Sequence, residues 1–473
     1  MRRKLNIQQN IMLFIMVGVS ILTSLLVLFD IDKPSYYHLL PLLPLTFAVA
    51  TTICYSMLSI IPDNIGVSGI VFLFFVRDVI SPLFLFFGDY SATITKNIQY
   101  NTDKAVLLVV YETLAVFAVM FILFLRSGKE GKVNENIKIN RINKRNYGVI
   151  LIALLAILIL CIFICPDLLR GYRTIFQLAN PLSTTLEDAY VVQQYGQSFI
   201  TKLSLVLGQY LMRILLIVVP AYFMVVLSNK ATVLSKLVSF CCCFIPTLFI
   251  GGTIARSLIY VFSLFLLFVY LQPNRLSNFL IVGIAASAVI VIVIWWIYRA
   301  SFLGSFNSII RSFSERFSAY FSGVNVVSGT FNLPNNVGDK IHYFLYDYLG
   351  SIPFGTTLFG LYGSRIAEFF NLCSESSGQI PTTIGMGYYY FGYVLAPLYS
   401  SVFACIAYVS GKKIITETNS FAKIRWILMA IYFTLGIVMY NIEITLSTVF
   451  SLLLPLYLVE ILANNKRGII NDN

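Results

Sequence analysis

Long apolar runs separated by short polar clusters dominate this sequence. A helix needs about 20 mostly apolar residues to cross the hydrocarbon core of a bilayer, and runs of that length recur along the whole chain. The chain is therefore expected to be an all-α integral membrane protein with about twelve transmembrane helices. The predicted spans are residues 11–29, 39–61, 66–87, 105–125, 147–165, 200–227, 237–252, 257–272, 279–297, 387–410, 426–441 and 447–462.

Composition and charge agree with that pattern. The chain is 58% hydrophobic and only 11% charged, which no soluble domain approaches. Lysine and arginine in short loops stay on the cytoplasmic side during insertion. The basic segments 126–146 and 411–425 then lie inside, together with both termini. The net charge of +12 is explained by topology, and no nucleic-acid partner is needed.

Three parts follow from this topology. Residues 1–297 form a membrane domain with nine spans and a smaller outer loop at 166–199. Residues 298–386 form one large extracytoplasmic loop, and residues 387–473 hold three C-terminal spans and a cytoplasmic tail. Because this loop is the one long polar interruption, we expect function to reside there.

The outer loop is predicted to contain amphipathic helices. At helical spacing one narrow arc collects Phe306, Ile310, Phe313, Phe317, Tyr320 and Phe321, as in a helix that lies on the membrane surface. Arg311 and Glu315 are four residues apart and are expected to pair. Arg316 lies at the edge of the apolar arc.

A second helical segment, 340–349, carries candidate chemistry. Helical spacing puts His342, Tyr343, Tyr346 and Asp347 on one face, which combines a proton acceptor, a carboxylate and two phenols. Such a face suits a sugar, because aromatic rings stack on pyranose C–H groups and polar tips bind hydroxyls. The alternative is aromatic packing at the membrane interface.

Arginines are frequent on the predicted outer side, although the insertion rule disfavours them there. Arg256 lies in a very short connection between two spans, where its planar guanidinium could bind phosphate oxygens or only reach lipid headgroups. The full set is Arg170, Arg173, Arg256, Arg299, Arg311, Arg316 and Arg365.

Charged residues inside the predicted spans are costly unless they are paired or face a cavity. Arg77 and Asp78 are adjacent in the third span, and they either line a polar pocket or form a structural clasp with the span that carries Glu112. Arg213 lies in the sixth span. No cofactor or metal site is predicted, although Asp30 and Asp32 after the first span are a weak alternative for a divalent cation.

Three short sequence motifs accompany the predicted spans and the large outer loop. They are Gly251-Gly252-Thr253-Ile254-Ala255-Arg256-Ser257, Ser318-Ala319-Tyr320-Phe321-Ser322-Gly323, and Pro381-Thr382-Thr383-Ile384-Gly385 before Tyr390-Phe391-Gly392. With the dozen spans and the late outer loop, the chain resembles the Wzy-type oligosaccharide repeat-unit polymerases of bacterial O-antigen and capsule synthesis.

The resemblance implies a GT-C-like membrane glycosyltransferase in the bacterial inner membrane. Such enzymes join undecaprenyl-pyrophosphate-linked oligosaccharides at the outer face, in some cases with a chain-length regulator protein. It implies that the arginines neutralise the leaving pyrophosphate, with Arg256, Arg311, Arg316 and Arg365 as main candidates and Arg170 and Arg173 from the other loop. His342 or Asp347 would be the base. Alternatives are a lipid-linked oligosaccharide flippase or other transporter, and an O-antigen ligase.

Overall fold

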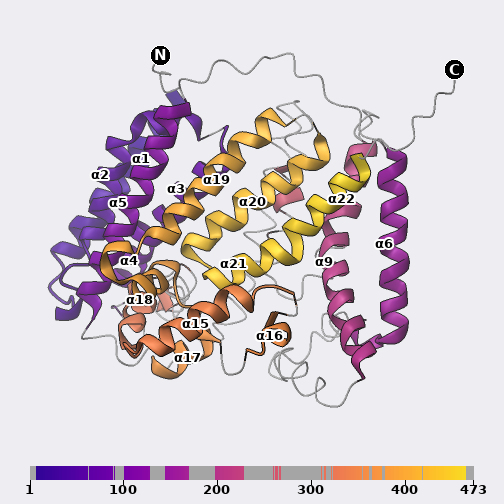
Figure 1. Cartoon of the computed structure of the whole chain (residues 1–473). Coiled ribbons are helices and arrows are strands. Elements are labelled where there is room, and N and C mark those ends of the chain that lie inside the picture. The colour runs from indigo at the N-terminus through magenta and orange to yellow at the C-terminus, as the bar shows by residue number, and fades with distance from the viewer. Residues whose placement is uncertain are drawn as a thin grey trace. The chain divides into compact units, whose positions relative to one another are not determined.

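The computed structural model describes residues 7–61, 63–88, 90, 101–127, 144–169, 198–227, 259, 262–264, 266–267, 310–311, 314–315, 321, 323–353, 355–361, 365–374, 379–417 and 419–464. Within these ranges every regular element is a helix (Figure 1). The predicted spans 237–252 and 279–297 lie outside the described residues, and 257–272 lies largely outside them.

Eight helices in the described part are long and apolar enough to cross a membrane, or nine if one bent pair counts as a span. Each overlaps a span predicted from the sequence, so the multi-pass membrane protein is confirmed, while the number twelve stays a prediction. The eight are Gln9–Leu28, Ser35–Ile53, Ile65–Phe87, Thr102–Ser127, Arg145–Ile164, Phe199–Tyr222, Phe421–Val438 and Ile442–Ala463.

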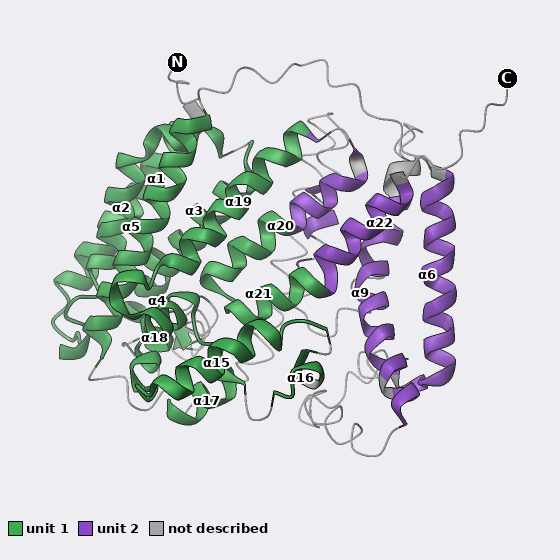
Figure 2. Cartoon of the chain, in the orientation of Figure 1, with its two compact units in different colours: residues 1–135, 290–416, 429–450 green, residues 136–289, 417–428, 451–473 purple. Residues whose placement is uncertain are grey.

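The chain divides into two compact units (Figure 2). Unit 1 comprises residues 1–135, 290–416 and 429–450, and unit 2 comprises residues 136–289, 417–428 and 451–473. The polar segment 298–386 therefore belongs to the same unit as the first four spans.

Unit 1 is a helical bundle in which sequence-distant helices pack together. Helix α2 packs on α1 and α5, α19 packs on α3 and α5, and α14 packs on α5. The helices are α1 (Ile7–Leu28), α2 (Leu42–Ile53), α3 (Ile65–Phe75), α4 (Ser81–Phe87), α5 (Thr102–Ser127), α14 (Val324–Gly329), α15 (Val337–Leu349), α16 (Gly355–Leu358), α17 (Ile366–Cys373), α18 (Thr383–Leu395), α19 (Leu398–Thr416) and α21 (Ile442–Thr448), with α20 (Ser420–Val438) divided between the units.

Short 3-10 and π segments join several of these helices. A π segment lies between α3 and α4, and another follows α21. The segments are η1 (Ser35–Tyr37), η2 (Tyr55–Ile60), η3 (Val76–Ile80), η5 (Thr330–Asn332) and η6 (Val449–Leu453).

Part of the predicted outer loop is packed into the bundle core. Val324 and Val327 of α14 share one buried apolar cluster with Val27, Leu43 and residues of α5. Helices α15 and α17 gather at the end of unit 1 opposite to the start of α1 (Figure 1). The described helices α14, α15 and α17 of the polar segment are therefore part of unit 1.

Helix α3 begins where the sequence provides a cap. The Asn64 side chain accepts hydrogen bonds from the backbone N–H groups of Gly66 and Val67, at 3.1 and 3.2 Å. The same side chain donates to the backbone oxygen of Tyr408 in α19, at 3.0 Å. The cap thus also fixes α3 against α19.

Close helix approach at this point requires glycine. A Cβ at Gly66 would lie 2.1 Å from the backbone oxygen of Ala407, whereas a Cβ at Gly18 in α1 would meet nothing within 4 Å. Because Ala407 presents backbone and not a flexible side chain, α19 would have to shift.

We expect Gly66→Ala to lower stability by about 1–3 kcal/mol, the usual cost of overpacking. The matched Gly18→Ala should be neutral or stabilising by up to about 1 kcal/mol, since alanine favours helix. Thermal unfolding of the two purified variants measures the difference. Equal melting temperatures would contradict the close packing of α3 on α19.

The predicted span 387–410 contains a sharp bend. Helices α18 and α19 meet at 107°. Gly392 has φ 76° and ψ −177°, a conformation open to glycine, and Pro397 precedes the start of α19. The break leaves Tyr389 and Tyr390 on a separate short helix, near α15.

Unit 2 is built around α6 (Lys144–Ile164) and α9 (Phe199–Leu227), which pack on each other and on α22 (Leu454–Asn464). A short 3-10 segment, η4 (Pro166–Leu169), follows α6. Cys161, Leu168 and Leu205 belong to its buried apolar cluster. Arg425 forms an ion pair with Glu460 at 3.0 Å.

Candidate functional site

Helix α15 contributes the central residues of the candidate site. Asn336 caps its start, where the Asn336 side chain accepts a hydrogen bond from the Gly338 backbone N–H at 3.1 Å. Tyr343, Tyr346 and Asp347 are buried, while His342 is half-buried. The buried face of α15 therefore unites Asp347 with the two phenols.

Asp347 is only 1% exposed. The Tyr390 hydroxyl of α18 donates a hydrogen bond to its Oδ2 at 2.5 Å. Its other oxygen, Oδ1, is buried and has no hydrogen-bond partner within the part of the chain that the structure describes. A carboxyl group with one unused acceptor can bind a further hydroxyl donor.

Burial raises the pKa of Asp347 from 3.8 to about 8. The hydrogen bond from Tyr390 lowers the pKa, and the nearby negative charge of Glu443 raises it. Asp347 is therefore largely protonated at neutral pH and becomes a base near pH 8. Groups with such a pKa are suited to proton transfer at working pH.

A charged pair borders Asp347. Arg365 Nε lies 3.4 Å from Glu443 Oε1, and 61% of the Arg365 side chain is exposed against 11% of the Glu443 side chain. Glu443 lies in the first turn of α21, which Asn441 caps by accepting from the Ile444 N–H at 2.8 Å. The guanidinium thus faces solvent beside a buried acid.

Helices α15 and α21 are also joined through Ser351. Its hydroxyl contacts the backbone oxygen of Asp347, and it lies 3.2 Å from the backbone oxygen of Glu443. This contact holds the two acidic residues close together.

The aromatic rings of this region pack mainly on one another. Tyr343 stacks on Phe369 with ring centroids 4.8 Å apart, and the Tyr348 hydroxyl donates to that of Tyr399 at 2.8 Å. Tyr343 and Tyr346 are 8% and 7% exposed. Sugar stacking on these two rings would require them to be uncovered first.

His342 and Asp347 lie on different sides of α15, because five helical positions separate them by about 140° around the axis. The His342 ring contacts the rings of Tyr343 and Tyr346, with centroids 5.2 and 6.2 Å away. The predicted face therefore divides into a buried carboxyl side and a partly exposed imidazole side.

Other predicted site residues are placed only in part. Arg311 is helical and exposed. Its neighbour Ser314 is buried, and a Cβ on Gly88 at the end of α4 would lie 3.2 Å from the Ser314 Cβ. Outside the described residues lie Arg170, Arg173, Arg256, Arg299 and Arg316.

The two acids after the first span make local contacts. Asp30 Oδ2 accepts a hydrogen bond from the Tyr90 hydroxyl at 2.6 Å, and Oδ1 accepts from the Asp32 backbone N–H at 3.1 Å. Among the described residues no group of three or more metal-binding side chains is found. The weak alternative of a cation site at Asp30 and Asp32 stays a prediction.

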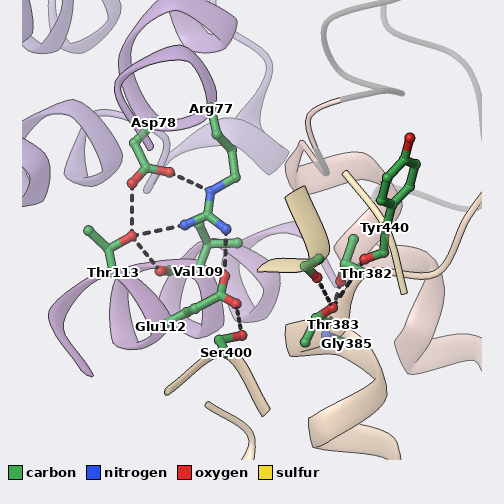
Figure 3. A network of polar contacts seen from close by, with 11 residues as sticks. Arg77, Asp78, Val109, Glu112, Thr113, Thr382, Thr383, Gly385, Ser400 and Tyr440 are labelled. Atoms are coloured by element: carbon green, nitrogen blue, oxygen red, sulfur yellow. Dashed lines mark hydrogen bonds and ion pairs between the residues drawn. The ribbon is translucent and has the colours of Figure 1, made fainter. Parts of the chain in front are cut away.

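A second polar cluster lies inside the bundle of unit 1 (Figure 3). Arg77 pairs with Asp78 through Nε at 2.7 Å and with Glu112 through Nη1 at 2.5 Å, and all three side chains are at most 1% exposed. Arg77 Nη2 donates to Thr113 Oγ1 at 3.0 Å, and the Ser400 hydroxyl donates to Glu112. The cluster joins η3, α5 and α19.

The sequence left open whether Arg77 and Asp78 would neutralise each other or line a pocket. They do pair, because the long arginine side chain folds back to the adjacent carboxylate within a π-helical turn. The cavity beside Arg77 is about 10 Å³, room for no more than one water. The geometry favours a structural clasp with Glu112.

Figure 3 also shows how the start of α18 is fixed. Thr382 Oγ1 accepts from the Gly385 N–H at 2.9 Å, and Thr383 Oγ1 lies 3.1 Å from the Tyr440 backbone oxygen. These contacts position the helix that carries Tyr390.

Sequence reasoning did not single out Tyr390 or Glu443 as partners of Asp347. A signal for Glu443 exists, since an isolated acid at the edge of a long apolar run is costly and marks a function or a partner. Tyr390 carries no such signal, because it stands in a run of three tyrosines.

Comparison of the chain with protein-family models, curated proteins and solved structures finds no match.

Proposed function

We propose that this protein polymerises undecaprenyl-pyrophosphate-linked oligosaccharide repeat units into a surface polysaccharide at the outer face of a bacterial cytoplasmic membrane. The observation that carries this proposal is the Asp347 carboxyl group, which is buried, has a pKa of about 8 and lies beside the ion pair of Glu443 with exposed Arg365. Its Oδ1 has no hydrogen-bond partner among the described residues. The site belongs to a polar segment held at one end of a membrane bundle.

The reaction is a glycosyl transfer in which the donor glycan is activated by lipid pyrophosphate and not by a nucleotide. Ionised Asp347 takes the proton of an acceptor sugar hydroxyl, whose oxygen forms a bond to the anomeric carbon of the donor glycan. The bond from that carbon to the lipid pyrophosphate breaks, and the pyrophosphate leaves with the electron pair. Arg365 neutralises the charge that develops on it. Because Asp347 is buried, the acceptor reaches Oδ1 only when a covering side chain moves.

A gene deletion separates this function from its rivals. Loss of a polymerase leaves surface glycan as single capped units on a sizing gel. Loss of a ligase leaves undecorated lipid core with free polymer, and loss of a flippase traps units at the cytoplasmic face. Either of the last two patterns would overturn the proposal.

We expect Arg365→Gln to reduce chain elongation by about 10²–10³-fold, the usual effect of removing one group that stabilises a developing negative charge. The reduction should fall on kcat more than on KM, and Arg365→Lys should retain part of the activity. Arg126→Gln is the matched control, since Arg126 is exposed at the far end of α5 in the same unit. Polymer length in cells that express each variant at equal level measures the effect, and an unchanged ladder for Arg365→Gln would exclude Arg365 from the reaction.

A further inference from the structure

The cluster around Arg77 holds more acid than base. It contains one guanidinium, that of Arg77, and two carboxyl groups, those of Asp78 and Glu112, and none of them is more than 1% exposed. If both acids were ionised, the cluster would carry a net charge of −1 inside the bundle. Among the described residues, Arg77 is the only cation found paired with these two acids, and a buried charge without a partner is costly.

The number of hydrogens available to the Thr113 hydroxyl indicates which of the two acids carries a proton. Thr113 Oγ1 accepts from Arg77 and therefore has one hydrogen for two acceptors. These are the Val109 backbone oxygen at 3.0 Å and Asp78 Oδ2 at 2.8 Å. A helical threonine commonly donates to the carbonyl four residues before it. With the hydroxyl donated to Val109, the contact between Thr113 and Asp78 lacks a hydrogen.

The other carboxyl group has no such deficit. Glu112 Oε2 accepts from Arg77 Nη1, and Oε1 accepts from the Ser400 hydroxyl. Each Glu112 oxygen therefore has a donor of its own, one of them charged, which is the arrangement that stabilises an ionised carboxylate. Between the two acids, Asp78 is the one whose neutral form completes the hydrogen bonds.

We propose that this cluster is a proton-binding site. One proton stays bound to Asp78 Oδ2, and this O–H group donates a hydrogen bond to Thr113 Oγ1. The Thr113 hydroxyl then donates to the Val109 backbone oxygen. Arg77 and Glu112 form the ion pair, and the cluster as a whole is neutral. Every polar contact shown in Figure 3 between η3, α5 and α19 is satisfied by this arrangement. The site is independent of the proposed glycosyl transfer.

Asparagine distinguishes the two acids. It mimics a protonated aspartic acid, since its amide group donates to Thr113 while its oxygen accepts from Arg77. Asp78→Asn is therefore expected to unfold at the wild-type temperature. Glu112→Gln removes the carboxylate that neutralises Arg77 and is expected to unfold at a clearly lower temperature. If Asp78→Asn proved as damaging as Glu112→Gln, the proton would not reside on Asp78.

Infrared spectroscopy of the full chain in lipid nanodiscs observes the proton directly. The carbonyl band of a protonated carboxylic acid should persist above pH 8 in the wild type and in Asp347→Asn, and should be absent from Asp78→Asn. The contribution of Asp347 is recognised because it disappears as the pH passes about 8. A carbonyl band that persists above pH 8 in Asp78→Asn would overturn the proposal, and so would the absence of such a band above pH 8 in the wild type. Both results can be obtained even if Glu112→Gln fails to fold.

Discussion

Arg77→Leu is expected to destabilise the protein by about 3–5 kcal/mol, the cost of leaving a buried charge without its partner. Glu112 would lose the only cation that it contacts in the described part of the chain, and Asp78 and Thr113 would lose a donor. Because total stability is only about 5–15 kcal/mol, most of the folded protein should be lost at growth temperature. Thermal unfolding in detergent and the yield of inserted protein measure the effect.

A double variant separates a lost charge partner from a lost side chain. Replacing both members of a buried ion pair by apolar residues is often neutral or stabilising, so Arg77→Leu with Glu112→Leu should recover much of the stability that Arg77→Leu loses. If the double variant were as unstable as the sum of the single ones, the damage would come from packing and not from the unpaired charge of Glu112.

Asp347→Asn is expected to abolish chain elongation, with a loss of about 10²–10⁴-fold, because amide groups do not accept protons at these pH values. The same assignment gives the pH profile of the wild type. A base must be ionised, so activity should rise by about tenfold per pH unit below the Asp347 pKa of about 8 and reach a plateau above it. Polymer formation in membranes between pH 6 and 9, roughly the range in which most proteins stay folded, measures both.

Substitutions of two neighbours of Asp347 should shift the pH profile of activity in opposite directions. The Tyr390 hydrogen bond lowers the Asp347 pKa, so Tyr390→Phe should shift the rise in activity to higher pH. The Glu443 charge raises the Asp347 pKa, so Glu443→Gln should shift the rise to lower pH. A residue with only a structural role would change the amount of activity without such opposed shifts. Two shifts in the same direction would mean that Asp347 is not the titrating base.

The membrane-spanning helices were the most predictable part of the fold. Apolar runs near 20 residues identify them because the bilayer imposes that length, and each of the eight described helices overlaps such a run. The break between α18 and α19 was missed, because an apolar run looks the same whether it is straight or bent. Gly392 and Pro397 were visible, but only the left-handed φ of Gly392 shows that the backbone turns there.

The candidate site was predictable only within one helix. Helical spacing brings Tyr343 next to Asp347, whereas Tyr390 and Glu443 reach Asp347 from other helices. Such contacts depend on how helices pack, which the spacing within a single helix does not contain. The pairing of Arg77 with Glu112 was named as one possibility, because a buried charge requires a partner and few acids occur in the spans.

The most direct measurement uses purified protein in vesicles with undecaprenyl-pyrophosphate-linked repeat units added to the leaflet that the outer segment faces. The proposed polymerase should produce glycans of several repeat lengths and release undecaprenyl pyrophosphate, and the Asp347→Asn variant should produce neither. Units that keep their length while they move to the opposite leaflet would contradict the proposal.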